Sequence, residues 1–345
     1  MTTAADLVLL LGLAPALAVA GVVANTPGYN AWPMVQAVGG KLFCTYSRGS
    51  GHSIGEGRRD AFARVSADGG KTWRREVVVS ANPDEGEVMI GKGLDSSGAA
   101  LFWVRCLGKS NHHDLYRTVD GESFEKIATP SLDPFPMQVT DIVKVNRGLL
   151  CLWFQTDYGA DGKSSWVTLL SSDGGRTWVQ KTVERDLALP DLPTEPSFVN
   201  LGNGRLLGIA RTEIAGDKGG RQFQLISTDE GRTWRKTRTN IADVRMSTPS
   251  LVLDRETGFV YNYYYERGKG RVKRRVARAA EVFDRPESWP EPTVVASGHE
   301  ERPHDAGNVN VTVLGRTHCL AYYFGTRMNA AVHVVTADVI PTDCP

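Results

Sequence analysis

The sequence predicts an all-β fold, a six-bladed β-propeller, and two observations support this prediction. A turn sequence, Ser-x-Asp-x-Gly-x-Thr-Trp, returns along the chain at a nearly constant interval. Between its copies the chain reads as short apolar strands bounded by glycine or charged residues, with no convincing amphipathic helix. A strand-rich repeat of roughly 50 residues is typical of propellers, in which each unit forms one four-stranded blade.

Three full copies of the turn sequence begin at Ser66, Ser171 and Ser227, and a degraded copy begins at Thr118. These starts lie 52, 53 and 56 residues apart in chain order. Continuing the same step reaches two weak sites, which are Ala280–Asp284 followed by Trp289, and Thr336–Asp338. Six units at this interval account for nearly the whole of the 345-residue chain.

The turn sequence has a structural explanation. Its aspartate can accept backbone N–H groups, its glycine can adopt a positive φ, and its tryptophan can pack between neighbouring sheets. Such a turn joins the two outer strands of a blade, whereas propellers bind ligands at the central channel. We therefore expect the repeat to set the number and phase of the blades and to contact no substrate.

The N-terminal residues allow two interpretations. Residues 7–20 are apolar and end in Ala-Val-Ala, as the core of a secretory signal does, but no Lys or Arg precedes them. Residues 18–25 could instead supply the fourth strand that the last unit lacks, which would close the ring and remove the sheet edges. We expect residues 1–20 to be a signal-like or strand-closing segment and residues 21–345 to form a single propeller domain.

Composition excludes several classes of partner. The formal net charge of +1 gives no global electrostatic reason to bind nucleic acid. The apolar run near the N-terminus is too short and too broken to predict a membrane span. The five cysteines are scattered without a Cys-x-x-Cys pair, so we predict no metal site, no disulfide framework and no cofactor.

Ligands of a propeller bind at the mouth of the central channel, where the second strand of each blade ends. Five of the six predicted second strands place an arginine at or beside that position, namely Arg48, Arg105, Arg211, Arg267 and Arg327. One such arginine would be an ordinary solvated strand end, but five in register predict a ring of guanidinium groups. Guanidinium binds carboxylate in bidentate fashion, so the expected ligand is anionic, and a carboxylated sugar fits.

Two residues are the main candidates for proton transfer. Glu195 is the only acid at the start of a predicted inner strand, where it could act as a base or could serve only to orient Arg211. His52 lies in the glycine-rich loop of the first blade, where it could donate a proton or could be an ordinary exposed histidine. Glu56 and Asp60, near His52, are alternative proton donors.

At these residues the sequence resembles the sialidase superfamily, whose members carry the same turn repeat, the Asp box. The stretch from Thr194-Glu195-Pro196 to Arg211 resembles the sialidase segment with the catalytic glutamate and one arginine of a carboxylate-binding triad. The first sialidase arginine belongs to an Arg-Ile-Pro sequence, and the matching stretch here is Ala31-Trp32-Pro33. The sialidase loop with the aspartate acid/base matches residues 52–60, and the tyrosine nucleophile has no identified counterpart.

The order of the motifs is closest to that in the catalytic propeller of bacteriophage tailspike endosialidases. The matching positions are residues 29–33, His52, Glu195, Arg211, Thr248-Pro249 and Glu266-Arg267. This resemblance implies an arginine pair that binds carboxylate, catalytic Glu and His groups, and no tyrosine nucleophile. Those tailspikes carry a stalk after the propeller, which this sequence lacks, so we expect exo-action on terminal sugars. The expected location is secreted, periplasmic or virion-associated.

We therefore expect a sialidase-type glycoside hydrolase that removes terminal sialic acid, or a related carboxylated sugar, from glycans. Trp32, Gln155 and Asp157 would shape the sugar pocket beside the arginines. Two alternatives remain open. One is a glycan-binding propeller of the tailspike type that is non-catalytic or endo-acting, and the other is a glycosidase or lyase directed at uronic acids. In each case the partner is a sialylated or other acidic glycan.

Overall fold

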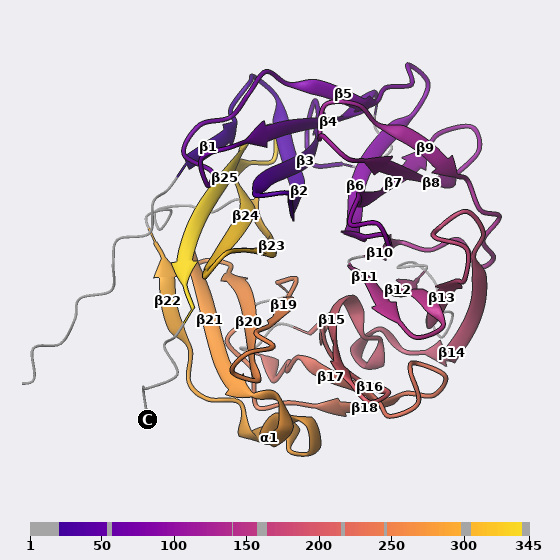
Figure 1. Cartoon of the computed structure of the whole chain (residues 1–345), viewed down its shortest axis with the longest axis vertical. Coiled ribbons are helices and arrows are strands. Elements are labelled where there is room, and N and C mark those ends of the chain that lie inside the picture. The colour runs from indigo at the N-terminus through magenta and orange to yellow at the C-terminus, as the bar shows by residue number, and fades with distance from the viewer. Residues whose placement is uncertain are drawn as a thin grey trace, which may run out of the picture.

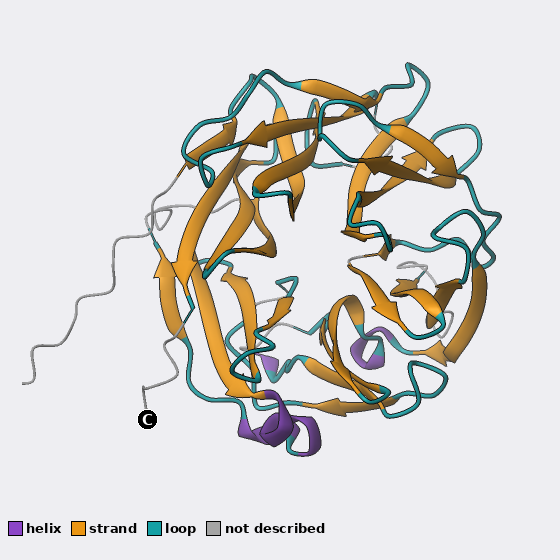
Figure 2. Ribbon diagram, viewed as in Figure 1, coloured by secondary structure: helices purple, strands orange, loops and turns teal. Residues whose placement is uncertain are grey.

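The computed structural model describes residues 21–53, 57–139, 141–156, 164–214, 218–244, 247–297 and 305–339. Within these residues the chain is all-β, as predicted, with a single short α-helix, α1 (Ala279–Asp284), and 3₁₀ turns at Leu189–Asp191 and Pro286–Ser288 (Figure 2). The strands are β1 (Gly21–Ala24), β2 (Tyr29–Val38), β3 (Lys41–Gly49), β4 (Arg59–Ser66), β5 (Val77–Ser80), β6 (Gly86–Leu94), β7 (Ala100–Leu107), β8 (His112–Thr118), β9 (Glu125–Ala128), β10 (Gln138–Val139), β11 (Asp141–Val145), β12 (Gly148–Gln155), β13 (Ser164–Ser171), β14 (Val179–Leu187), β15 (Thr194–Gly202), β16 (Arg205–Arg211), β17 (Phe223–Ser227), β18 (Arg235–Arg238), β19 (Ser250–Leu253), β20 (Phe259–Glu266), β21 (Arg271–Arg278), β22 (Thr293–Ala296), β23 (Asp305–Leu314), β24 (Thr317–Thr326) and β25 (Asn329–Asp338).

Consecutive strands pair antiparallel in groups that follow one another around a central axis (Figure 1). The first strand of each group lies nearest the axis, and the later strands lie progressively further out. In chain order the groups are β2–β5, β6–β9, β10–β14, β15–β18, β19–β22, and β23–β25 with β1.

The first described strand, β1, completes the last group. β1 pairs antiparallel with β25, with Gly21 opposite Val334 and Ala24 opposite Val332. The pairing expected for residues 18–25 is therefore confirmed over Gly21–Ala24, and residues 18–20 lie outside the described part of the chain. In Figure 1 the indigo N-terminal strands consequently lie beside the yellow C-terminal ones.

Each full Asp box is closed by its aspartate. Asp173 accepts hydrogen bonds from the Thr177 N–H at 2.9 Å and from the Thr177 hydroxyl at 2.6 Å. The Ser171 hydroxyl donates to Asp173 at 2.8 Å and accepts the Gly175 N–H at 2.8 Å. These bonds, the Thr177 hydroxyl above all, lower the pKa of Asp173 to about 2. The boxes at Asp68 and Asp229 repeat the pattern.

The boxes also join neighbouring groups. Trp178 packs against Trp103 of the preceding group, with ring centroids 5.2 Å apart. Gly231, at φ +79°, lies so close to Leu150 of the preceding group that a Cβ there would come within 2.5 Å of the leucine. The turn is therefore both a local structure and a contact between sheets, which is the role that the sequence predicts for it.

The two weak repeat sites do not form this turn. The expectation of a box at Ala280–Asp284 is wrong, because these residues belong to α1. The stretch is rich in alanine and contains no glycine, so helix propensity prevails over the repeat. Trp289 is nevertheless buried, and its indole Nε1 donates to Gln224 of the preceding group at 3.0 Å. Thr336–Asp338 is the end of β25.

No helix in the described ranges has the length and apolar character that a membrane crossing requires. Four cysteines, Cys44, Cys106, Cys151 and Cys319, are buried with free thiols, and Cys344 lies outside the described residues.

Replacing Gly231 with alanine should destabilise the fold more than replacing Gly174 of another Asp box. Both glycines have positive φ, +79° and +76°, so both substitutions carry a backbone cost of about 1 kcal/mol. Only at Gly231 would the added Cβ also meet Leu150, whereas at Gly174 it meets no atom within 4 Å. Urea unfolding should show a further loss of about 1–3 kcal/mol for Gly231→Ala. Equal losses would contradict the contact between groups.

Candidate functional site

A pocket of about 260 Å³ is lined by residues near the starts of β2, β15 and β23, which are first strands of their groups. It is lined by Trp32, His52, Arg105, Met137, Gln138, Phe154, Glu195, Arg211, Arg267, Asn308 and Tyr323. The structure thus brings together six of the residues singled out from the sequence, namely Trp32, His52, Arg105, Glu195, Arg211 and Arg267. They come from four different groups, so no single group forms the pocket.

Three pocket residues occupy the left-handed backbone region. Trp32, Glu195 and Asn308 have φ values of 52°, 47° and 47°. Each lies where the ladder between the first and second strands of its group shifts register, in β2, β15 and β23. A non-glycine residue in this region costs roughly 1–3 kcal/mol, and such strain gathers at binding and catalytic sites. The recurrence of this backbone conformation at three positions lining one pocket makes the pocket the candidate functional site.

The carboxylate of Glu195 is held on both sides. Its Oε1 lies 3.0 Å from Nη1 of Arg211, and its Oε2 accepts a hydrogen bond from the Thr248 hydroxyl. Arg211 in turn pairs with Glu213, with Nη2 and Oε1 2.9 Å apart, and the Thr194 hydroxyl donates to Glu213 at 2.7 Å. The side chains of Glu195 and Arg211 are only 12% and 11% exposed, so both have fixed orientations at the pocket wall.

The other two pocket arginines are anchored to backbone carbonyls. The Nε of Arg267 donates to the Ala306 carbonyl at 2.9 Å, and its terminal nitrogens make no hydrogen bond within the described part of the chain. The guanidinium lies against Gly307, where a Cβ would come within 3.2 Å of Nη2. Arg105 donates from Nη1 to the Met137 carbonyl at 3.0 Å. These anchors orient the guanidinium groups before any ligand binds.

Aromatic rings surround His52. Its Nδ1 lies 2.8 Å from the Tyr29 hydroxyl, and its ring centroid lies 5.8 Å from that of Trp32. Tyr323 adds a ring 5.8 Å from Tyr29 and 6.3 Å from Trp32. The hydrogen bond between Tyr29 and His52 fixes the orientation of the imidazole ring at the pocket wall.

Sequence reasoning missed Arg59, whose guanidinium packs against the rings of Tyr29 and Trp32, which with Tyr323 form the aromatic wall around His52. Its guanidinium carbon lies 4.6 Å from the Trp32 ring centroid and 5.6 Å from that of Tyr29. Burial lowers the pKa of Arg59 to about 10, so the group stays charged at neutral pH. Its Nη2 donates to the Gly51 carbonyl, at the start of the loop with His52. Nothing in the sequence around Arg59, which directly precedes Asp60, indicates that its side chain packs against Trp32 and Tyr29.

The other predicted side chains that the structure describes do not line the pocket, although the Arg327 carbonyl accepts the His52 N–H at 2.7 Å. Arg48 points away from the pocket and binds Glu76 through two contacts of 2.9 Å. Asp60 pairs with Arg58 at 2.8 Å. Gln155 lines a separate pocket of about 220 Å³, and Arg327 lies in an exposed turn between β24 and β25.

Strand alternation explains why Arg48 differs from the other arginines. Its neighbour Ser47 accepts the Met89 N–H at 2.8 Å, which turns Ser47 toward the adjoining first strand and Arg48 to the opposite face. Three of the five predicted arginines therefore line the pocket. Glu56 and Asp157 lie outside the described residues.

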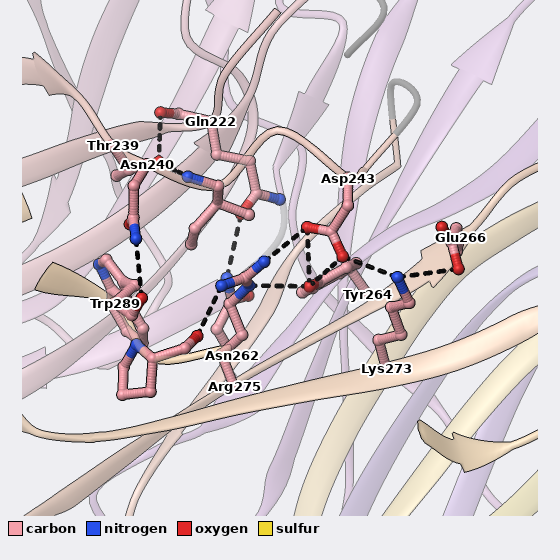
Figure 3. Close-up of polar contacts among 12 residues, drawn as sticks. Gln222, Thr239, Asn240, Asp243, Asn262, Tyr264, Glu266, Lys273, Arg275 and Trp289 are labelled. Carbon is pink, nitrogen blue, oxygen red and sulfur yellow. Dashed lines mark hydrogen bonds and ion pairs between the residues drawn. The ribbon is translucent and has the colours of Figure 1, made fainter. Parts of the chain in front are cut away.

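An ion-pair network connects β20 and β21 with Asp243 and lies beside the end of β20, immediately before Arg267 (Figure 3). Lys273 Nζ lies 2.9 Å from Glu266 Oε2 and 2.8 Å from Asp243 Oδ2. Arg275 Nη2 lies 2.8 Å from the other oxygen of Asp243. Glu266 is the last residue of β20, so this network holds the strand end from which Arg267 reaches the pocket.

With this geometry established, comparison with known proteins supports the fold. A family model described as a BNR repeat-like domain matches residues 153–322. No curated protein sequence matches the chain. The structure of a protein of unknown function from Dyadobacter fermentans has a TM-score of 0.74 at 16% identity, covering 93% of this chain and 98% of that one.

Two sialidases are also similar in structure. A Hadza microbial sialidase has a TM-score of 0.68 at 15% identity, covering 90% of this chain and 66% of that one. A Trypanosoma rangeli sialidase has a TM-score of 0.64 at 12% identity, covering 90% of this chain and 55% of that one. This chain thus spans less than two thirds of either sialidase. At these identities the likeness shows the fold, which is all-β with sialidase-like structural neighbours.

Asp243→Asn should destabilise the protein by roughly 2 kcal/mol at pH 7, because it leaves Lys273 and Arg275 without their shared partner. Burial would raise the pKa of Asp243, but hydrogen bonds from Lys273 and Arg275 hold it below its ordinary value. The stabilisation is therefore present above the unfolded pKa of about 4 and is lost as the pH falls through the folded value.

Urea unfolding at pH 7 and at about pH 3 checks this prediction, with the exposed Asp284→Asn as the control. The difference between wild type and Asp243→Asn should shrink at the lower pH. A difference that is unchanged or larger in acid would show that the ionised carboxylate is not the stabilising group.

Proposed function

We propose that this protein is a sialidase-type glycoside hydrolase that removes a terminal sialic acid, or a related carboxylated sugar, from glycans. One observation carries the proposal. Three guanidinium groups, a carboxylate and an imidazole line the same pocket, through Arg105, Arg211, Arg267, Glu195 and His52. A pocket rich in fixed cations selects an anionic ligand, and the two remaining groups are those that acid–base chemistry needs.

Arg267 is the main carboxylate ligand in this proposal. Its terminal nitrogens make no hydrogen bond within the described residues, while its Nε is fixed by Ala306, so a substrate carboxylate can pair with it in bidentate fashion. Arg211 and Arg105 supply further positive charge to the same ligand. Each is already oriented by a protein acceptor, so little conformational entropy is lost on binding.

Glu195 and His52 carry the proton transfers. Glu195 acts as the base for the attacking water or activates another nucleophile, and its bonds to Arg211 and Thr248 hold it in place for that step. His52 donates the proton to the leaving glycosidic oxygen, with Tyr29 orienting its ring. The positive pocket wall also attracts the carboxylate of the substrate, which brings the developing oxocarbenium ion close to Glu195.

The finer features of the protein are part of the same proposal. We assign six blades to the strand groups, closed by β1, over a domain that begins at residue 21. The pocket volume of about 260 Å³ suits one sugar residue, which favours exo-action over cleavage within a polymer. A secreted, periplasmic or virion-associated location, and the kinship with tailspike propellers, are kept as expectations from the motif order.

Glu195→Gln should abolish sugar release while preserving binding, because the amide keeps the shape but cannot accept a proton. The test measures release from a fluorogenic sialoside and binding to a glycan array. Loss of at least about 100-fold in kcat is expected. Glu76→Gln is the matched control, since Glu76 pairs with Arg48 away from the pocket and its loss should leave kcat unchanged.

The alternatives give different results in the same assays. Binding of acidic glycans without release by wild type would establish a binding propeller. Release of uronic rather than sialic acid would assign the pocket to uronic-acid substrates. Neither binding nor release of any carboxylated sugar would reject the proposal.

His52→Asn should slow release from natural sialosides more than from sialosides with an activated aryl leaving group. A proton donor lowers the barrier most when the leaving oxygen is strongly basic, so the ratio of the two rates should change by about 10–100-fold. His333→Asn, at a partly exposed position of β25, serves as the control. An equal loss on both substrates would assign His52 a positioning role instead.

A further inference from the structure

A second cluster of reactive side chains lies outside the pocket, on strands β6 to β8 of the β6–β9 group. It consists of Glu85, Glu87, Cys106, His112 and Asp114, and we name it the β7 cluster. Cys106 is buried in β7, and its ladder partners are Glu87 on β6 and His112 on β8. Residues directly opposite in an antiparallel ladder project from the same face, and so do residues two apart on one strand. Glu87, Cys106, His112 and Asp114 therefore share one face of this sheet, and Glu85, just before β6, lies beside Cys106 and His112.

We infer that the β7 cluster is a binding site for Zn²⁺, with Glu85, Cys106 and His112 as its protein ligands. One donor atom from each of these residues lies within 4.8 Å of the donor atoms of the other two. Ligands around a tetrahedral zinc ion are separated by about 3.5 Å, so a small contraction of side chains is enough to bind the ion. When zinc binds, the Cys106 thiol loses its proton to solvent, and the resulting thiolate sulfur coordinates the zinc ion.

The donor set indicates zinc rather than calcium or magnesium. A thiolate, an imidazole and a carboxylate form the mixed S, N and O set that zinc accepts, whereas calcium and magnesium bind oxygen ligands. The Nδ1 of His112 lies 2.9 Å from the Ser110 carbonyl, a contact that orients the ring, and its Nε2 lies 3.7 Å from Asp114 Oδ2, a further carboxylate beside the three ligands.

An independent observation also points to a cation. Glu87 is only 1% exposed, and its Oε1 accepts the Ser80 hydroxyl at 2.6 Å, while no side-chain or ion-pair partner for its Oε2 is found among the described residues. A buried carboxylate oxygen without a partner is costly unless a cation is near. Asp114 is compensated by Lys126, with Nζ and Oδ2 3.2 Å apart, but no comparable ion pair is formed by Glu87 in the described ranges.

The local backbone is shaped around Glu85. Gly108 follows β7, and a Cβ at this position would come within 2.7 Å of Glu85 Cγ and 2.8 Å of the Asp84 carbonyl. Glycine therefore lets the Glu85 side chain lie across the end of β7, next to Cys106. The neighbouring residue Arg105 points to the opposite face and lines the pocket, so a bound ion would brace the strand end that carries Arg105.

The test uses the full chain, stripped of metal with a chelator and then titrated with Co²⁺ and with Zn²⁺. Co²⁺ should bind with one equivalent and give the intense near-ultraviolet band of a cobalt–thiolate bond, and Zn²⁺ should displace it. Cys106→Ala should lose the band, and the Zn²⁺ affinity should fall at least about 100-fold. Cys319→Ala removes another buried thiol, on β24, and should bind as wild type does.

His112→Asn provides a second variant, because His112 is partly exposed and its replacement should leave the fold intact. It should also bind Zn²⁺ at least about 10-fold more weakly. Two results would overturn the inference. One is the absence of stoichiometric Zn²⁺ uptake by wild type, and the other is equal Zn²⁺ affinity for wild type and both cluster variants. The metal measurements need no glycan, so their outcome is independent of the proposed function.

Discussion

The arrangement of the pocket depends on the pairing of β1 with β25, which joins residues from the two ends of the described chain. Beside this pairing, Asn30 donates to the Ala330 carbonyl at 2.9 Å across 300 positions of sequence. The join places Tyr29 and Trp32 against Tyr323, and these rings form the aromatic wall around His52. No single strand group contains this wall, so the wall forms only when the first and last groups of the described chain have met.

The fold could be predicted to the extent that its determinants are local. The Asp box at Asp173 makes its hydrogen bonds within a few residues, so its sequence alone specifies the turn. Where the box is degraded, local propensity decides instead, and residues 279–284 form α1. The pairing of β1 was predictable because the last unit lacked a strand. The assignment of one blade to each strand group follows from treating the groups as repeats of one unit.

The candidate site was harder to predict, because it depends on which face each side chain takes. Glu195, Arg211 and Arg267 could be recognised at strand ends, but the register that turns Arg48 toward Glu76 could not be read from spacing. A displacement of one residue reverses the face of a strand. Arg59 was missed because its contacts are with rings that are distant in sequence. The β7 cluster escaped notice for a similar reason, since cross-strand pairing assembles it without any Cys-x-x-Cys spacing.

The order of the strands also bears on how the protein is made. β1 is synthesised first but has its partner in β25, which is synthesised last among the described strands. During translation the intervening groups can form as they emerge, while β1 waits with an open edge for most of that time. Completion of the pocket must therefore follow synthesis of nearly all the described strands. A ribosome-bound fragment that ends before β24 would lack both the pairing of β1 with β25 and the Tyr323 ring of the aromatic wall. Joining such distant segments is slow, because the entropy of closing a long loop is lost before the new contacts repay it.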